Sequence, residues 1–460
     1  MGENTERMAR RAKGRGFAGC NRLSGMVLAA AMLALPAAGA RTEEGAGSGK
    51  AVAAGDRKLQ QPVHQLPGDF PARPSLPPSW SIPYEPLGLA APGPLYLGER
   101  NVLVSLDFLG EDRLLFTFRV PGLLHREPGD GEERYIRACV LALPGGTVQA
   151  EATWIVHDRS RYLWALDDSH FLLRDRNVLL EGDASLKLKP FLRFPGRVLT
   201  VNLDPDRKYL ATNSREPVPA QTLQAGTAPA GDDSGDAHGA AQPAAPDLVA
   251  RVLRRDSGGV VLVDRVRQMV RLPLNEEGYL DMLRGNRDDD WDVEMHYFSG
   301  GHKTMGSVLS ACAPDLDFLS DTEVLASGCS DRGDQALVAL STDGEKLWTD
   351  LTTDRQVWPL LRVAPEGGRF VRETLYVTHA VGLFAPLGDE DIRGQWVQVF
   401  NDADGEVVFE SPASPIFDGG GNAAISPSGR RVAVIDKGAI EVFELPAAPR
   451  PAAHAGGGRP

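Results

Sequence analysis

The sequence lacks the residue patterns that mark the common catalytic and metal sites. Its nine histidines form neither an H-x-H nor an H-E-x-x-H pattern, and no G-x-S-x-G motif is present. We interpret the densest acidic run, residues 288–292, as a solvated loop between strands, although clustered oxygens can also bind hard cations. No catalytic residue, metal or cofactor is therefore predicted, and the balance leans against an enzyme.

Long apolar runs are also missing after the first 40 residues, so no membrane span is expected beyond that point. A basic stretch precedes a short apolar run at residues 26–35, and small residues end at Ala40 before Arg41. This order is typical of a secretory signal peptide. We predict that residues 1–40 are cleaved between Ala40 and Arg41, which makes the protein periplasmic or extracellular. An uncleaved anchor is the alternative, but Pro36 interrupts an apolar run that is already short.

Excess positive charge is absent as well. The formal net charge is −13, and removal of the basic first segment makes the remaining chain still more acidic. Such a chain is a poor general binder of nucleic acid. We therefore expect a monomer whose partner is a protein or a small molecule, and not a nucleic acid.

Glycine and proline are abundant, with 50 and 34 residues, which favours a turn-rich all-β protein. Residues 41–98 are predicted to be a Pro-rich flexible leader, and residues 447–460 a flexible tail. Residues 214–247 are rich in Ala, Pro, Gly and Asp and are predicted to be a disordered insertion. The folded domain is expected at 99–446, around this insertion.

One unit recurs through this domain: an apolar strand, a turn of Asp, Pro, Gly or Ser, and a second apolar strand. Clear copies lie at residues 201–211, 361–371 and 424–434. A second hairpin with Gly in its turn follows most copies, because Gly supplies the positive φ that tight hairpins need. Two hairpins in succession make a four-stranded antiparallel unit.

These units repeat at the spacing of a β-propeller. They open near residues 102, 160, 198, 268, 314, 358 and 420. A period of ~40–50 residues with four strands per unit predicts a single propeller of about seven blades. Six or eight blades remain open because the unit near 268 is degenerate. The last unit is short of a strand, and we expect residues 94–100 to supply it and close the ring.

Cysteine is scarce, with four residues in the chain. If Ser320 and Asp321 form a two-residue turn, Cys312 faces Cys329 across a hairpin. Opposed residues of an antiparallel pair lie ~4.5–5.5 Å apart at Cα, which a disulfide bridges. Export favours this bond, and two buried thiols are the alternative. Cys139 lies in an apolar run and is expected to be a small core residue.

Candidate binding residues come from two similar polar segments that lead into innermost strands. In a propeller such loops crowd one face near the central channel, where ligands usually bind. Hydrogen bonds or ion pairs between blades are the alternative role. The candidates are His157, Asp158, Arg159, Arg161, Asp354 and Arg355.

The segments VNLDPDRKYLAT, ISPSGRRVAVI and LSTDGEKLWTD resemble blades of the YVTN/WD40-like propeller superfamily, which includes the TolB-type periplasmic propellers. Together with LLFTFRVPGLLHR, YLWALDDSHFLLRD and LKPFLRFPG, they are similar to uncharacterised exported propeller proteins of bacteria. The resemblance covers about residues 95–446 and implies fold and export only, because that group has no known catalytic residues. The repeated Gly-His and Trp-Asp pairs of true WD40 blades are missing here.

Two functions follow. The first is a non-enzymatic binding or scaffold propeller in the cell envelope or outside the cell. The second is a propeller enzyme, glycosidase- or lyase-like, that uses carboxylates around the channel. Several carboxylates converging on one channel mouth would favour the enzyme, whereas a channel lined by apolar and paired residues would favour the binding protein.

Overall fold

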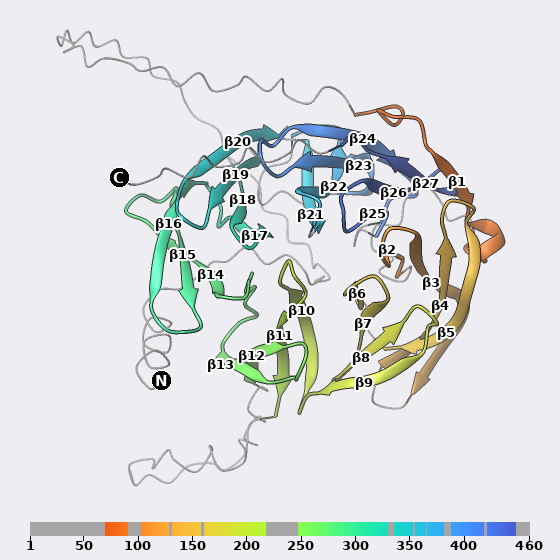
Figure 1. The fold of residues 1–460 in the computed structure, drawn as a ribbon, viewed down its shortest axis with the longest axis horizontal. Coiled ribbons are helices and arrows are strands. Elements are labelled where there is room, and N and C mark those ends of the chain that lie inside the picture. Colours follow the sequence, from red (N-terminus) through yellow and green to blue (C-terminus); the bar gives the residue numbers. More distant parts are fainter. Residues whose placement is uncertain are drawn as a thin grey trace, which may run out of the picture.

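The computed structural model describes ten stretches of the chain, and everything below concerns these residues. They are 70–90, 103–127, 131–157, 161–217, 247–329, 335–352, 355–364, 366–380, 388–417 and 421–447. The fold is all-β, with seven small sheets arranged as blades around a central axis (Figure 1). The prediction of a seven-bladed propeller is confirmed. None of the helices in these stretches is long and apolar enough to cross a membrane.

Six blades are four-stranded antiparallel sheets, and their order along the chain is their order around the ring (Figure 1). Blade 1 consists of β2 (Ser105–Phe108), β3 (Arg113–Glu127), β4 (Gly131–Ala142) and β5 (Thr147–Val156). Blade 2 consists of β6 (Leu163–Ala165), β7 (His170–Asp175), β8 (Val178–Asp183) and β9 (Leu188–Arg193). Blade 3 consists of β10 (Arg197–Leu203), β11 (Tyr209–Glu216), β12 (Asp247–Arg254) and β13 (Val260–Val266).

The other half of the ring continues the pattern. Blade 4 consists of β14 (Gly278–Arg284), β15 (Asp290–Tyr297) and β16 (His302–Leu309). Blade 5 consists of β17 (Asp315–Ser320), β18 (Glu323–Cys329), β19 (Gln335–Ser341) and β20 (Lys346–Thr352). Blade 6 consists of β21 (Gln356–Ala364), β22 (Arg369–Val377), β23 (Ile392–Asn401) and β24 (Val407–Ala413). Blade 7 consists of β25 (Ala423–Ile425), β26 (Arg431–Asp436), β27 (Ala439–Glu444) and β1 (Trp80–Pro83). Two short 3-10 helices, η1 (Glu85–Leu87) and η3 (Asp389–Asp391), lie in connections.

The ring is closed by β1, the first described strand, which pairs antiparallel with β27 at the end of the domain (Figure 1). We expected residues 94–100 to close it, and this expectation was wrong because β1 is the fourth strand of blade 7. The side chain of Ile82 is buried against the neighbouring core, whereas Ser81 and Pro83 are exposed. Pro83 is tolerated because β1 is an edge strand, where a missing N–H breaks no ladder bond.

Blade 4 is the degenerate unit that the sequence indicated near residue 268. The place of its innermost strand is taken by a segment that forms a single β-bridge, between Leu274 and Tyr279. The N–H of Leu280 donates to the carbonyl of Pro273 at 2.8 Å. Pro273 has no N–H to donate, so a regular ladder does not extend through this segment.

The recurring turn of the sequence unit joins the first and second strand of each blade. At its start a short polar side chain accepts a hydrogen bond from a backbone N–H further on, which is why Asp, Asn or Ser recurs there. The bonds run from His170 N to Asp167 Oδ1 at 2.9 Å, from Tyr209 N to Asp204 Oδ1 at 2.7 Å, from Gly278 N to Asn275 Oδ1 at 3.0 Å and from Arg431 N to Ser426 Oγ at 3.2 Å.

The boundaries predicted for the insertion at 214–247 were too wide. Strand β11 continues to Glu216 and β12 begins at Asp247, so the ends of the predicted insertion belong to blade 3. The polar end of β11 is stable as a strand because Arg251 on β12 satisfies it. The Arg251 guanidinium donates to Ser214 Oγ and to Glu216 Oε2, each at 2.9 Å. The intervening residues 218–246 lie outside the described stretches.

The predicted disulfide between Cys312 and Cys329 is confirmed, with the two Cα atoms 5.7 Å apart. The register predicted for its hairpin was wrong by one residue, because Ser320 pairs with Glu323 after a bulge. Cys312 precedes β17, and there the chain turns back so that Ala311 N donates to Cys329 O at 2.8 Å. The third cysteine that the structure describes, Cys139, is a buried free thiol, as expected.

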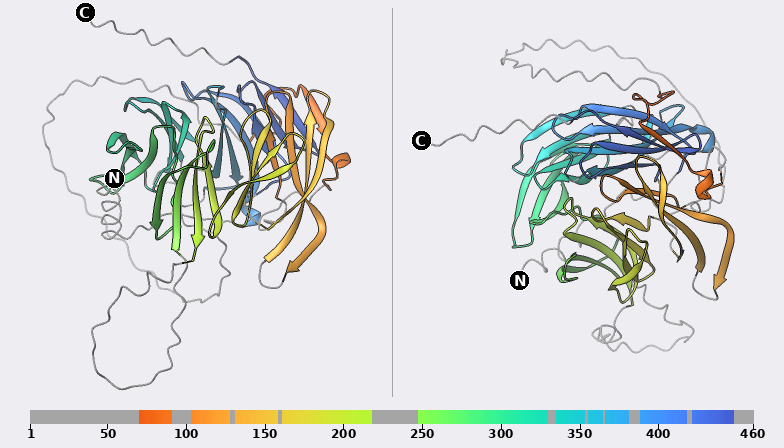
Figure 2. Two further views of the ribbon diagram at one scale, coloured as in Figure 1. Left: turned by 60° about the horizontal axis from the view of Figure 1, so that its bottom comes forward. Right: turned by 45° about the vertical axis from the view of Figure 1, so that its right-hand side comes forward.

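Neighbouring blades are joined near their turns at all seven interfaces, in addition to the apolar contacts between their faces. Each interface has one polar contact in which a side chain of one blade reaches the next. The contacts are Arg113–Asp168 O, Arg255–Asp167, Lys208–Glu276, Asn275–Asp321 O, Trp348–Asp402 O, Arg369–Gly429 O and Arg431–Glu111 O. The β3–β4 hairpin is the longest and extends past the neighbouring blades (Figure 2).

Candidate binding site in the central channel

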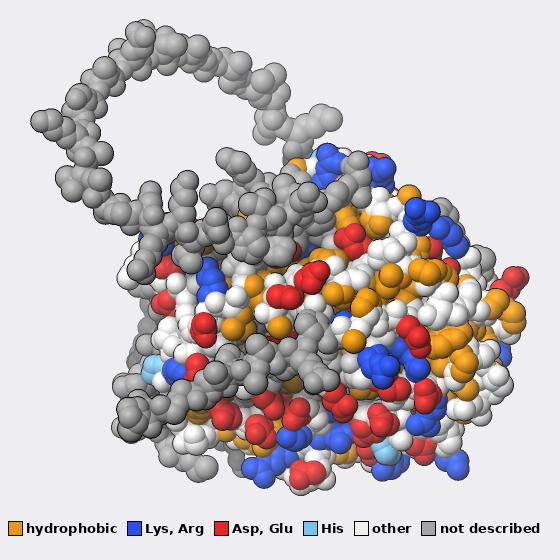
Figure 3. Space-filling model, turned by 45° about the horizontal axis from the view of Figure 1, so that its top comes forward, with side chains coloured by type: hydrophobic (Ala, Val, Ile, Leu, Met, Phe, Trp, Pro, Cys, Tyr) orange, Lys and Arg blue, Asp and Glu red, His pale blue; other side chains and the backbone are white. Residues whose placement is uncertain are grey.

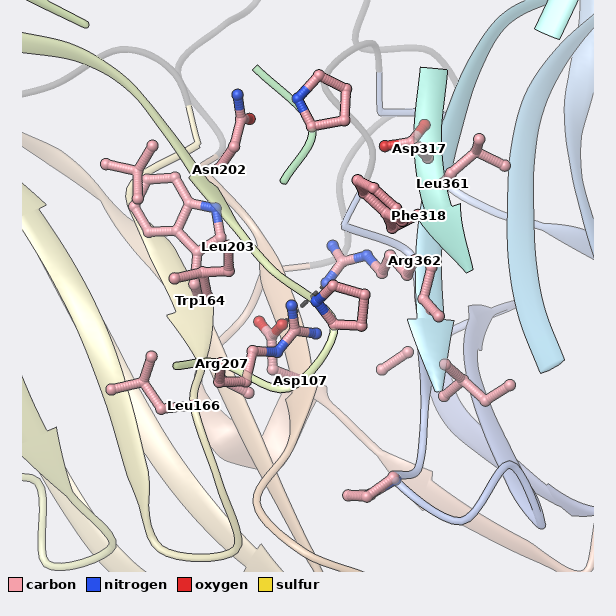
Figure 4. A pocket seen from close by; sticks show the side chains of 18 of the residues that line it. Asp107, Trp164, Leu166, Asn202, Leu203, Arg207, Asp317, Phe318, Leu361 and Arg362 are labelled. Atoms are coloured by element: carbon pink, nitrogen blue, oxygen red, sulfur yellow. Dashed lines mark hydrogen bonds and ion pairs between the residues drawn. The ribbon is translucent and has the colours of Figure 1, made fainter. Parts of the chain in front are cut away.

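A cavity of about 200 Å³ lies on the axis of the ring (Figure 4). Its wall is built by the first strand, or the corresponding segment, of every blade, because these segments are nearest to the axis. One lining residue from each blade in turn is Asp107, Trp164, Leu203, Pro273, Phe318, Leu361 and Ile425. The wall is therefore mostly apolar, with a small number of charged groups, as in many small-molecule sites.

One charged pair crosses the wall between blade 1 and blade 6. Arg362 Nη1 lies 2.9 Å from Asp107 Oδ1, and both side chains are largely buried. Arg362 also donates to the carbonyl of Leu106 at 3.2 Å, and Ser105 Oγ donates to Asp107 Oδ2 at 2.6 Å. A second carboxylate, Glu373, lies 3.6 Å from Arg362 Nε. Burial raises the pKa of Glu373, and the charge of Arg362 opposes that shift.

A second pair lies on the side of blades 4 and 5. The guanidinium of Arg271 is bonded to Asp317, and its Nη1 is 3.4 Å from Asp315 Oδ1. The charge of Asp317 raises the pKa of Arg271 above its ordinary value, with a further contribution from Asp315. This arginine is therefore held charged and fully engaged by acidic partners.

Two further arginines that line the cavity, Arg161 and Arg207, form no ion pair within the described stretches. Arg161 Nε donates to Leu163 O at 3.3 Å, and Arg207 Nη1 donates to Asp204 O at 3.2 Å. Enclosure by the protein lowers the pKa of Arg161, and the charge of Arg362 lowers it further. Enclosure also lowers the pKa of Arg207, which nearby carboxylates oppose.

The guanidinium of Arg161 has a fixed orientation because it lies over the ring of Trp164, at 5.4 Å from the ring centroid. Figure 4 shows Asp107, Arg207 and Arg362 converging on the axis from three blades. Together with Arg161 they place three guanidinium groups around the single carboxylate of Asp107, so this part of the channel carries excess positive charge.

Of the six predicted binding residues, Asp158, Arg159 and Asp354 lie outside the described stretches. Arg161 lines the cavity. His157 is engaged between blades, since its N–H donates to Asp175 Oδ1 at 2.9 Å and its Nδ1 lies 3.1 Å from the same atom. The carbonyl of Arg355 accepts the N–H of Val377 at 2.9 Å. The binding role of the six stays a prediction.

The sequence reasoning missed Asp107, Arg207 and Arg362. Each sits among apolar strand residues or in a turn that has an ordinary surface composition. Arg207 lies in the recurring turn of blade 3 with a φ of 60°, and this left-handed backbone conformation accompanies a side chain that faces the channel. A signal was present at Arg362, because it interrupts the apolar run that opens its unit.

No family model and no curated protein matches this sequence. Among solved structures, an acylaminoacyl peptidase of Pyrococcus horikoshii is similar at 10% identity and a TM-score of 0.42, over 74% of this chain and 51% of that chain. The chain thus spans about half the length of that peptidase. Hsv2p of Kluyveromyces lactis has 14% identity and a TM-score of 0.34, over 62% of this chain and 74% of that chain. A structure of the mitotic checkpoint complex has 12% identity and a TM-score of 0.38, over 86% and 98%. The propeller assignment rests on the strand order and not on these likenesses.

Proposed function

We propose that the protein is an exported, non-enzymatic propeller that binds its ligand in the central channel. The observation that carries this proposal is the pairing of the three aspartates of the cavity wall. Asp107 is bonded to Arg362, Asp317 to Arg271, and Asp167 to His170 and Arg255. A carboxylate engaged in this way is poorly placed to act as a general acid, base or nucleophile.

Export is part of the proposal and rests on two independent features. The sequence of residues 1–40 has the organisation of a signal peptide. The Cys312–Cys329 disulfide is of the kind that persists in oxidising compartments. N-terminal sequencing of the protein recovered from the native source is expected to begin at Arg41.

The channel proposal is tested by a thermal-shift screen of the mature protein against sugars, peptides, organic acids and metal ions. Hits are then remeasured on Asn202→Phe, which places a bulky side chain in the cavity wall. The matched control is Asn286→Phe, the same substitution in the exposed turn after β14. Binding in the channel predicts at least a tenfold loss of affinity for Asn202→Phe and no change for Asn286→Phe. Hits that both variants bind equally would overturn the channel as the site, and a screen without hits would favour a protein partner.

A further inference from the structure

Resting on that proposed function, we infer that the channel ligand is a small organic carboxylate held by Arg161 and Arg207. The two guanidinium groups line the same cavity and form no ion pair within the part of the chain that the structure describes. The other arginines of the wall, Arg271 and Arg362, are already engaged by aspartates. The wall therefore has two basic groups available for an anion, and its carboxylates are occupied.

The backbone contacts of the two arginines hold them in place without neutralising them. Arg161 uses Nε on Leu163 O, and Arg207 uses Nη1 on Asp204 O, so the remaining N–H groups of each guanidinium have no printed acceptor in the protein. Guanidinium groups bind anionic oxygens through charge-assisted hydrogen bonds that are shorter and stronger than neutral ones. Removing part of the surrounding water strengthens these bonds further.

The orientation of Arg161 favours a planar anion. Its guanidinium lies over the Trp164 ring, so its faces are partly covered and its N–H edge remains for a ligand. A carboxylate matches that edge because it is flat and accepts two parallel hydrogen bonds. The cavity of about 200 Å³ limits the ligand to a small molecule.

The rest of the wall indicates what the carboxylate is attached to. Leu203, Phe318 and Leu361 lie on the wall of the same cavity (Figure 4). These side chains offer apolar surface to the body of a ligand whose anionic end reaches Arg161 and Arg207. The amide of Asn202, also on the wall, adds one donor and one acceptor.

The test compares acids with their neutral amides: acetate, succinate and phenylacetate against acetamide, succinamide and phenylacetamide. Isothermal titration calorimetry at low ionic strength is expected to show binding of at least one acid and at least tenfold weaker binding of its amide. Arg161→Gln and Arg207→Gln should each weaken binding of that acid at least tenfold. The affinity should also fall as salt is added.

Arg284→Gln is the matched control, because Arg284 also lies over a tryptophan, 5.8 Å from the centroid of Trp291, and donates to a backbone carbonyl. It belongs to an exposed turn away from the cavity, so the variant should bind the acid like the wild type. Retained folding of each variant is checked by its thermal unfolding midpoint, and Arg161→Lys should recover only part of the affinity because it restores charge without the planar fork.

Equal binding of an acid and its amide would overturn the inference, as would an affinity that both arginine variants leave unchanged. If a neutral compound from the screen binds, depends on Asn202 and does not depend on the arginines, the inference fails while the channel function stands. Inorganic phosphate that binds with the same arginine dependence, where none of the acids does, would overturn the assignment to a carboxylate.

Discussion

Arg362 of blade 6 and Asp107 of blade 1 form an ion pair with 2.9 Å between Nη1 and Oδ1, although blade 7 stands between their blades in the ring. The pair therefore passes the inner strand of blade 7 on the channel side. It narrows the channel and ties together two blades that share no strand pairing. Because Ser105 and the carbonyl of Leu106 belong to the same contact, the geometry is fixed by four hydrogen-bonding groups.

Loss of this pair should destabilise the fold. Arg362→Gln leaves the carboxylate of Asp107 buried without its ionic partner, which costs ~3 kcal/mol in the free energy of unfolding. The control Arg284→Gln removes an exposed contact with Asp288 and should cost less than about 1 kcal/mol. Urea denaturation followed by tryptophan fluorescence measures both. The double variant Asp107→Asn/Arg362→Gln should regain part of the loss, and equal costs for Arg362→Gln and Arg284→Gln would show that the channel pair has no special role.

Closure of the ring depends on one apolar side chain of β1. Ile82 is 6% exposed and packs in the core between blades 7 and 1, so Ile82→Ala should lower the free energy of unfolding by ~2–4 kcal/mol. Ser81→Ala, at the neighbouring exposed position, should change it by less than about 0.5 kcal/mol. Chemical denaturation of the two variants decides, and an Ile82→Ala variant as stable as wild type would mean that β1 does not hold the ring closed.

The disulfide should stabilise blade 5 measurably. Its two cysteines are 17 residues apart in sequence, and a loop of this length corresponds to ~3 kcal/mol in the chain-entropy model. Cys312→Ser/Cys329→Ser is therefore expected to lower the thermal unfolding midpoint, and dithiothreitol should have the same effect on wild type but none on the variant. Conversely, Cys139→Ala removes a free thiol and should leave the response to dithiothreitol intact.

Asp402 should make stability fall as pH rises. Burial raises its pKa from 3.8 to about 8, with the charge of Glu323 adding to the shift and Arg369 opposing it. Between these two values the folded protein keeps a proton that the unfolded chain releases, so the free energy of unfolding decreases with pH in this window. Asp402→Asn should remove that component, which means that its stability relative to wild type increases from pH 4 to pH 8.

The exposed Asp404 of the same turn provides the control for this pH dependence. Asp404→Asn should follow the wild-type profile, because only burial distinguishes the two positions in this respect. Unfolding curves in urea at several pH values measure all three proteins. Parallel profiles for wild type and Asp402→Asn would contradict a raised pKa.

The number of blades and nearly all their hairpins could be predicted because they depend on local chemistry. Residues 401–405, for example, were expected to form a turn, and β23 ends at Asn401 as β24 begins at Val407. Gly405 shows why such positions are legible: its φ is 71°, and a Cβ there would lie 2.7 Å from the ring of Trp348. Glycine is needed both for the turn and for the close approach of the next blade.

The ring-closing strand and the channel residues were missed because they depend on contacts between distant parts of the chain. Trp80 and Ile82 do alternate with polar or exposed residues as in a strand, but prolines on both sides hide that short pattern. Arg207 and Arg362 carry no motif, and their meaning arises only when blades 3 and 6 face each other across the axis. The three-dimensional ring, and no local rule, brings these charges together.

The pairing of β1 with β27 also sets a timetable for folding. The strand that opens the described chain has its partner among the last residues to leave the ribosome, so six blades can form while the seventh still waits for its outer strand. Contacts between such remote segments form slowly, since the long intervening chain must first be ordered. Until then blade 7 has an exposed edge and the ring is an open arc. A stalled or shortened chain should therefore be vulnerable to edge-to-edge association at this seam.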